Sequence, residues 1–294
     1  MDRKMKTITL MTLKNEEWII DTTFPVLSEI SDKIIVADNN SKDNSNEMLK
    51  KYNVEIIENN NTTPSNTVRW NLLDKARERY GKNNLIICMD ADEFLPPVSF
   101  LKNKKKILSH VPGTIFSSPW VQVWRKVNQY RADNSIWNPS TNIKPFMFID
   151  DGEMDYDRTP LLIDHISRVP EVNVKKSINL KIPLVHLQFV NWKRSQLKQL
   201  WYQCIEVVNG NDINEINDKY KGASDEENIK YKKLKKQWID GVNLSKEIET
   251  SKTLDIWHVK EIKSMMNEFG KEKFINLNIL NTTFVDNLLK ELEI

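Results

Sequence analysis

The stretch LIICMDADE, residues 85–93, decides the fold, because an apolar run there ends in two carboxylates that lie one residue apart. Burying charged side chains is costly unless they are paired or bound to a metal. Side chains at positions i and i+2 of a strand share a face, so Asp90 and Asp92 are expected to point the same way. At the carboxyl end of a parallel strand, where ligands bind in open α/β sheets, such a pair predicts a hard-cation site. An acidic turn at the end of the strand is the simpler alternative, since short D-x-D sequences are common.

The sequence before this stretch alternates between strand and helix patterns. We expect strands at 7–13, 33–37 and 54–57, a helix at 64–80, and then the strand at 85–89. Strands and helices that alternate at this spacing indicate βαβ units and a mainly parallel sheet flanked by helices. The polar loops after the first, second and fourth strands would then meet at one edge of the sheet. These loops are residues 14–17, 38–43 and 90–93.

Four polar motifs follow one another in this half of the chain. They are KNEE at 14–17, D-x-x-S-x-D-x-S at 38–45, R-x-N at 69–71 and DADE at 90–93. With these motifs in this order, the chain resembles the family 2 glycosyltransferases, which have the GT-A fold. The resemblance covers the first hundred residues or so, weakens from there, and ends before the last third of the chain. It implies a Rossmann-like, mainly parallel α/β sheet flanked by helices, followed here by a helical C-terminal extension.

The resemblance also implies an activity, which is transfer of a sugar from a nucleotide-sugar donor, with Mn²⁺ or Mg²⁺ as cofactor. A UDP-sugar is the favoured donor, and the acceptor is expected to be a hydroxyl on a glycan, a lipid or a protein. A departing nucleoside diphosphate gains negative charge, which a cation and positioned hydrogen-bond donors stabilise. By family position, the residues expected to bind the nucleotide sugar are Thr12, Lys14, Glu16, Asp38, Arg69 and Asp90. A turn-forming role for Asp38 and an exposed helix position for Arg69 are the alternatives.

Three side chains are expected to form the metal site. The resemblance assigns Asp92 to the metal and Asp90 to the metal or to the ribose. His186 is the expected third ligand, because residues 184–186 match an L-x-H strand of the family and a late histidine completes the site in several GT-A enzymes. A neutral imidazole suits Mn²⁺, whereas Mg²⁺ prefers oxygen ligands. A core histidine bonded to the backbone is the alternative.

The catalytic base is harder to assign from the sequence. Inverting transfer, which we expect, requires a carboxylate that takes the proton of the acceptor hydroxyl. The candidates are Asp164, Asp157 and Asp155, in that order, with Asp164 first because it ends an apolar run. Each is also explained as an ordinary loop acid. Ile166 follows His165 where the family carries a glutamate, so the base stays unassigned, and the spacing does not exclude a retaining reaction.

The rest of the chain predicts a domain plan. We expect the catalytic domain at 1–208, a polar linker or mobile loop at 209–227, and a helical C-terminal extension at 228–294. Apolar residues at three- and four-residue spacing predict an amphipathic helix at the end of the catalytic domain. Helices are expected at 191–208, 228–239, 260–269 and 283–292.

The composition is that of an ordinary soluble enzyme. A net charge of +2 over 294 residues gives no case for bulk electrostatic binding to nucleic acid. Two cysteines form no disulfide framework, no apolar run is long enough to span a membrane, and no signal peptide is expected, so a cytoplasmic location is favoured. The basic stretches 102–106 and 231–238 predict solvated surface, with peripheral contact to acidic lipid headgroups as the alternative. Oligomeric state is left open.

Two other protein classes were weighed against a transferase. A sugar-nucleotide pyrophosphorylase needs a glycine-rich loop after its first strand, but this chain has KNEE there and its first glycine is Gly81. A degenerate GT-A-like module that binds carbohydrate or acts as a scaffold, without catalysis, is the stronger alternative. Its only support is the missing glutamate at position 166, because the acidic motifs are intact.

Overall fold

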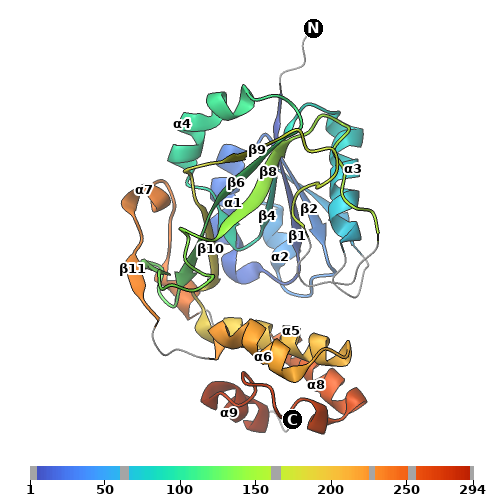
Figure 1. Cartoon of the computed structure of the whole chain (residues 1–294), viewed down its shortest axis with the longest axis vertical. Coiled ribbons are helices and arrows are strands. Elements are labelled where there is room, and N and C mark those ends of the chain that lie inside the picture. The colour runs from blue at the N-terminus through green and yellow to red at the C-terminus, as the bar shows by residue number, and fades with distance from the viewer. Residues whose placement is uncertain (1–4, 60–65, 160–166, 225–228, 251–255, 292–294) are drawn as a thin grey trace.

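The structure, a computed structural model, describes residues 5–59, 66–159, 167–224, 229–250 and 256–291. It has two parts, a sheet covered by helices on both faces and a helical lobe at one end of that sheet (Figure 1). The predicted α/β class with a mostly parallel central sheet is confirmed.

Four parallel strands form the first half of the sheet, in the order β3-β2-β1-β4. Their apolar runs are long because such strands are covered on both faces. The strands are β1 (Thr7–Leu13), β2 (Lys33–Asp38), β3 (Val54–Glu58) and β4 (Leu85–Asp90), and the helices that connect them are α1 (Glu17–Ile30), α2 (Ser45–Leu49) and α3 (Thr67–Tyr80). Each strand lies where the sequence predicts it, within one residue at either end.

The second half of the sheet is mixed. β8 (Ile143–Ile149) lies between β4 and β6 (Thr114–Trp124) and is antiparallel to both. β6 also pairs with the remaining strands of this half, directly or through a neighbour. These are β5 (Glu93–Phe94), β7 (Gln129–Arg131), β9 (Lys176–Asn179) and β10 (Leu184–Phe189). β10 pairs with β5 on one side and β6 on the other, which carries a late segment of the chain to the end of β4.

Apolar side chains fill a layer on each face of the sheet. One layer packs α1 and α4 (Pro97–Leu108) against the sheet through residues such as Phe24 and Phe100. The other packs α3 through Leu72 and Leu73 and includes Cys88 of β4. Because both faces are covered, ligands can reach the parallel strands only at their ends.

The helical lobe has an apolar cluster of its own. It is built by α5 (Trp192–Val208), α6 (Ile213–Tyr220), α8 (Ile256–Phe269) and α9 (Thr283–Glu291). α6 lies inside the segment predicted as a linker or mobile loop, and that part of the prediction is wrong. Ile216 and Tyr220 form its buried face against α5. Because the other residues of α6 are mostly polar, the apolar spacing of a helix is hard to recognise in the sequence. The domain boundaries themselves stay a prediction.

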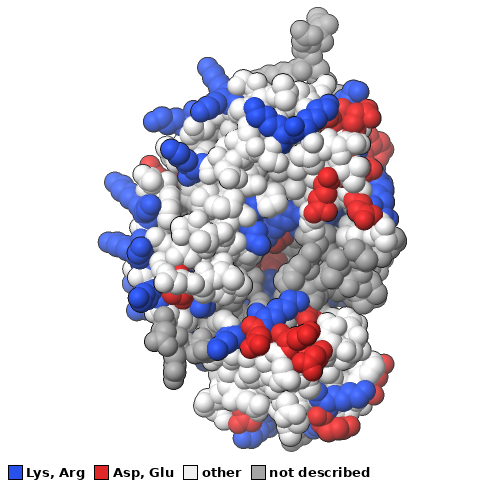
Figure 2. Space-filling model, viewed as in Figure 1, with Lys and Arg blue, Asp and Glu red and all other residues white. Residues whose placement is uncertain are grey.

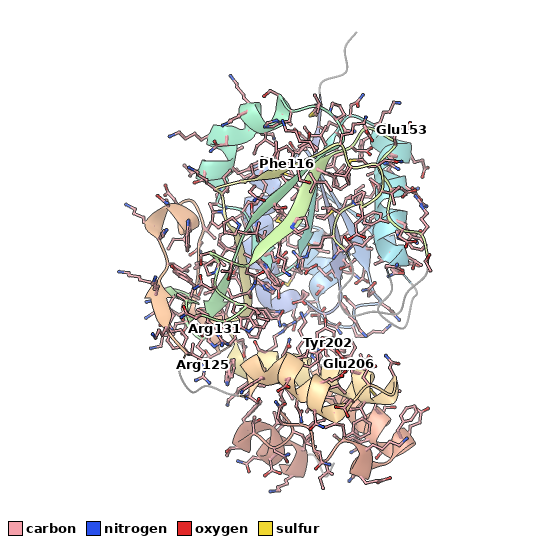
Figure 3. The ribbon with its side chains drawn as sticks, viewed as in Figure 1. Phe116, Arg125, Arg131, Glu153, Tyr202 and Glu206 are labelled. Carbon is pink, nitrogen blue, oxygen red and sulfur yellow. The ribbon has the colours of Figure 1, made fainter. Side chains whose placement is uncertain are left out.

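The helix predicted at 228–239 is also wrong in part. Its described residues form a short strand, β11 (Tyr231–Lys233), and one helical turn, α7 (Lys236–Ile239). β11 pairs antiparallel with β7, so its backbone forms hydrogen bonds with that strand instead of the hydrogen bonds of the predicted helix. Figure 3 shows Arg125 and Arg131 at this end of the sheet and Tyr202 and Glu206 on α5 in the lobe. Among the described residues, no helix combines the length and apolar content that crossing a membrane requires.

Candidate active site

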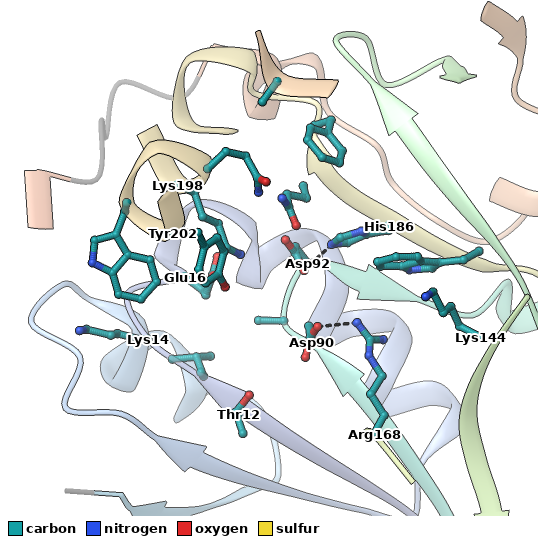
Figure 4. Close-up of a pocket in the computed structure, with 18 of the residues that line it drawn as sticks. Thr12, Lys14, Glu16, Asp90, Asp92, Lys144, Arg168, His186, Lys198 and Tyr202 are labelled. Carbon is teal, nitrogen blue, oxygen red and sulfur yellow. Dashed lines mark hydrogen bonds and ion pairs between the residues drawn. The ribbon is translucent and has the colours of Figure 1, made fainter. Parts of the chain in front are cut away.

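A cleft of about 750 Å³ lies between the carboxyl ends of β1 and β4 and the helical lobe. Figure 2 shows the hollow between the two parts of the molecule, with charged atoms inside it. The cleft brings together most of the residues that the sequence singled out. Those that line it are Thr12, Lys14, Glu16, Arg69, Asp90, Asp92 and His186 (Figure 4).

Asp90, at the end of β4, is held by two arginines. Arg69 Nη2 lies 3.0 Å from Asp90 Oδ1, and Arg168 Nη2 lies 2.6 Å from Asp90 Oδ2. Burial raises the pKa of Asp90, but the two guanidinium groups together lower it below its ordinary value. Asp90 is therefore an anion with both oxygens already paired.

Glu93 contacts the same cluster of charged side chains. Its side chain is fully buried and accepts hydrogen bonds from the backbone N–H of Asp90 (3.0 Å) and from Trp120 Nε1 (2.7 Å). Arg168 Nη1 also lies 2.5 Å from Glu93 Oε2, so one guanidinium bridges both carboxylates. No local pattern predicts a role for Arg168, because its partners lie 75 and 78 residues away in the chain.

Asp92 has a different environment two residues further on. His186 Nε2 lies 3.3 Å from Asp92 Oδ1, and His186 Nδ1 lies 2.8 Å from Gln122 Oε1. The imidazole stacks on Trp120, with 4.9 Å between ring centroids. Burial raises the pKa of Asp92, but His186 and Lys198 together lower it well below its ordinary value. Asp92 is thus also an anion, and the side chain nearest to it is an imidazole rather than a guanidinium.

The donor set at Asp92 bears on the expected metal. Among the described residues, no three His, Cys, Asp or Glu side chains are arranged to hold a metal ion. Asp92 Oδ2, however, is buried and has no hydrogen-bond partner in the described part of the chain. A histidine with one ring nitrogen beside an oxygen, as His186 Nδ1 lies beside Gln122 Oε1, is typical of metal ligands. Asp92 and His186 fit a cation that takes its other ligands from phosphate oxygens, as Mg²⁺ commonly does.

Lys198 of α5 lines the cleft opposite these carboxylates. Burial lowers the pKa of Lys198, but Asp92 and other nearby anions raise it above its ordinary value, so the side chain is charged. Glu16 is held from the same helix, because Arg194 Nη2 donates to Glu16 Oε2 at 2.8 Å. The sequence predicts the helix that carries Lys198, but not which of its polar side chains faces the cleft.

Asp38 is not among the side chains that line the cleft. Its carboxylate accepts hydrogen bonds from the backbone N–H and hydroxyl of Ser41 and from Asn46 Nδ2 (2.8 Å). These bonds close the turn after β2, and the predicted contact of Asp38 with the nucleotide stays a prediction. Asn39 and Asn59 line the cleft at this edge of the sheet.

The three base candidates have different outcomes. Asp164 lies in residues 160–166, outside the described residues. Asp155 Oδ2 pairs with Arg158 Nε at 2.9 Å, and Asp157 is exposed and accepts a hydrogen bond from the backbone N–H of Thr159. Neither is among the residues that line the cleft. Glu171, which the sequence did not single out, does line it, and its carboxylate has no hydrogen-bond or ion-pair partner among the described residues.

Comparison with protein families gives a match in sequence. Residues 9–154 match the family described as glycosyl transferase family 2. No curated protein sequence matches the chain significantly.

Comparisons with solved structures give remote likenesses. The crystal structures of S. aureus TarS 1-349, alone and in complex with UDP, are 10% and 12% identical to this chain, with TM-scores of 0.41 and 0.42. Both cover 98% of this chain and 92% of the other. Mannosyl-3-phosphoglycerate synthase from Rubrobacter xylanophilus is 17% identical over 42% of each chain, with a TM-score of 0.29. At these TM-scores the family assignment depends on the sequence match alone.

Proposed function

We propose that this chain transfers a sugar from a UDP-sugar to a hydroxyl acceptor with inversion. The chain belongs to glycosyl transferase family 2 through residues 9–154 and is a glycosyltransferase. The observation that carries the proposal is the grouping of three cationic side chains around the carboxyl end of β4. They are Arg69, Arg168 and Lys198, and all three line one cleft.

These cations suit the chemistry of a departing nucleoside diphosphate. Positioned donors stabilise charge that develops in the transition state, and guanidinium groups match phosphate oxygens in pairs. Arg69 Nη1 is buried with no hydrogen-bond partner in the described part of the chain, so Arg69 retains a donor for such an oxygen. Arg69 and Arg168 would then neutralise the diphosphate while Lys198 stays beside Asp92.

Asp92 and His186 would hold Mn²⁺ or Mg²⁺ in this proposal. A bound divalent cation would add positive charge at the diphosphate and help it leave. Asp90 keeps its proposed contact with the ribose or the metal, which requires its arginine partners to turn toward phosphate. Thr12, Lys14 and Glu16 line the cleft at the end of β1, where the nucleoside would lie.

The catalytic base is proposed to be Asp164 or Glu171. Asp164 keeps the position that the sequence gives it at the end of an apolar run. Glu171 is added because it lines the cleft without a partner for its carboxylate among the described residues. Asp155 and Asp157 are less suited, since neither lines the cleft. Comparing Asp164→Asn with Glu171→Gln distinguishes the two, because only loss of the base removes turnover while donor binding survives.

The acceptor, on a glycan, a lipid or a protein, is proposed to meet the enzyme at a cytoplasmic membrane surface. Lys102, Lys105 and Lys106 of α4 and both lysines of β11 are exposed, and Val98 and Leu101 of α4 lie near them with 49% and 39% exposure. Figure 2 shows Lys and Arg along the edge of the molecule where Figure 1 places α4, α7 and β11. Cationic side chains beside exposed apolar ones suit an anionic bilayer, because lysines are attracted to the anionic headgroups and apolar side chains can be buried among the lipids.

A thermal-shift panel tests the donor proposal. UDP-, GDP-, CMP- and dTDP-sugars would each be added with Mn²⁺, with Mg²⁺ and with chelator, because a ligand of the native state raises the melting temperature by mass action. We expect a metal-dependent rise with UDP-sugars. A rise with another nucleotide class would mean that the donor is not a UDP-sugar. A rise that persists with chelator would contradict the proposed metal dependence. No rise with any donor would contradict the proposed function.

A further inference from the structure

The helical lobe supplies one whole wall of the cleft, although no part of it was expected at the nucleotide site. Three of its helices contribute lining side chains. These are Lys198, Gln199, Trp201 and Tyr202 of α5, Lys219 and Tyr220 of α6, and Trp257 of α8.

Lys14, in the loop after β1, is attached to this wall by two contacts with α8. Its Nζ lies 2.9 Å from Glu261 Oε1 and 4.2 Å from the centroid of the Trp257 ring. An ammonium over an indole face is attracted by the electrons of the ring. Both contacts join residues about 245 positions apart in the chain.

Glu261 is itself held in one orientation. Its second oxygen, Oε2, accepts a hydrogen bond from Trp201 Nε1 of α5 at 2.6 Å. The Trp257 ring stacks on His258, with 3.6 Å between centroids, and meets Trp201 edge to face at 5.1 Å. The partners of Lys14 are therefore positioned by the packing of the lobe rather than by Lys14.

The loop is attached to the lobe at a second point, two residues further on. Glu16 Oε2 accepts from Arg194 of α5, a side chain that is 1% exposed. The Lys14–Glu261 pair is 27% and 42% exposed, and ion pairs this exposed add little to stability. Its consequence is geometric, because it determines where the Lys14 ammonium lies in the cleft.

We propose that Glu261 and Trp257 of α8 are positioning residues of the donor site, which orient Lys14 toward the nucleoside of the bound nucleotide. The inference rests on the proposed function, since it takes a nucleoside diphosphate as the ligand of the cleft. An ammonium has three N–H donors, and one is used by Glu261. The others can meet carbonyl or hydroxyl oxygens of the nucleoside. Preorganising the donor in this way lowers the cost of binding.

Glu261→Gln is the central variant, because it keeps the shape of the side chain and removes the charge that holds Lys14. We expect the Kd for UDP and the KM for the donor to rise about fivefold to tenfold, with kcat little changed. Glu268→Gln, on the same helix and without an ion pair among the described residues, is the matched control. Melting temperatures of both variants check that the lobe still folds.

Lys14→Ala and the double variant Lys14→Ala/Glu261→Gln complete a cycle. If Glu261 acts through Lys14, the double variant binds UDP no more weakly than Lys14→Ala alone. Trp257→Leu is expected to weaken UDP binding in the same direction.

The outcomes separate the two proposals. Wild-type protein that binds no nucleotide overturns the proposed function, and this inference with it. If the wild type binds UDP and both Glu261→Gln and Trp257→Leu bind it as tightly as the wild type does, the positioning role is overturned and the proposed function is not. Additive losses in the double variant also overturn the positioning role, because the two residues would then act independently.

Discussion

The two walls of the cleft are built in different ways. On the sheet side, three carboxylates lie at the end of β4, where Asp90 and Glu93 share Arg168 while Asp92 contacts His186. On the lobe side, the lining residues are long or aromatic side chains that project from helices, such as Lys198, Tyr202 and Trp257. Anionic side chains are therefore concentrated where the buried strand β4 ends, whereas the helices of the lobe contribute long side chains that extend toward them. We expect the sheet wall to carry the chemistry and the lobe wall to carry the positioning.

Asp92→Asn is the strongest challenge to the role of the sheet wall. The change keeps the shape of the side chain and removes the charge beside His186 and Lys198. We expect kcat to fall at least a hundredfold, or about 3 kcal/mol, as measured by release of nucleoside diphosphate. Asp151→Asn is the control, because Asp151 is also buried but pairs with Lys175 away from the cleft. An Asp92→Asn enzyme with unchanged kcat would show that the sheet wall does not carry the chemistry.

Arg77→Met tests whether buried charge outside the cleft serves the fold only. Arg77 Nη2 lies 2.6 Å from Asp150 Oδ1, and the Asp150 side chain is 1% exposed. Removing one partner of a buried pair leaves an uncompensated charge, so the free energy of unfolding should fall by about 2–3 kcal/mol. Urea unfolding measures this, and kcat should stay unchanged.

Arg158→Met is the matched control for that prediction. Its ion pairs with Asp74 and Asp155 lie at the surface, with the Arg158 side chain 41% exposed. We expect a loss of no more than about 1 kcal/mol. Equal losses for the two variants would mean that burial does not set the contribution of these pairs.

The two cysteines report on the two parts of the molecule separately. Cys88 lies in the sheet and Cys204 in the lobe, and burial raises the pKa of Cys88 to about 11 and that of Cys204 to about 12. Neither thiol should react with an alkylating reagent at pH 8 until its surroundings open. We expect Cys204 to react at lower urea than Cys88, with about 1–2 kcal/mol between the two opening free energies.

Mass spectrometry of the alkylated peptides measures this difference. If Cys204 reacts first, the lobe opens before the sheet, which would support the predicted division into a catalytic domain and a C-terminal extension. Identical urea dependence would instead mean that the sheet and the lobe unfold as one unit.

The last prediction concerns the basic face at α4, outside both walls of the cleft. Changing Lys102→Glu together with Lys105→Glu should weaken binding to vesicles that contain anionic lipid, by about 1 kcal/mol or more per lysine. Co-sedimentation measures the binding, and turnover with a soluble acceptor should not change. Lys75→Glu on α3, at the opposite side of the sheet in Figure 1, is the control. Equal sedimentation of all three proteins would contradict the membrane contact.

Prediction from the sequence succeeds where the relevant contacts are local. The strand at 85–90 and its acidic end follow from an apolar run and from the carboxylates after it, and Arg69 and His186 reach the cleft as expected. Asp38 also bonds within its own turn, because Ser41 and Asn46 lie close to it in the chain, and its contact with the nucleotide stays a prediction. The segment 209–227 was misread because a short helix with two buried residues shows a weak pattern.

The parallel core, the acidic end of β4 and the resemblance to a glycosyltransferase family could all be predicted from the sequence, since periodicity and motif order can be read along the chain. The packed structure was needed to show that arginines bind Asp90 while a histidine faces Asp92, two residues further along the chain. It was also needed to show that α8 lies against Lys14. The physical reason is that these partners come from distant segments, and their free energies depend on burial and geometry that exist only once the sheet and the lobe are packed together.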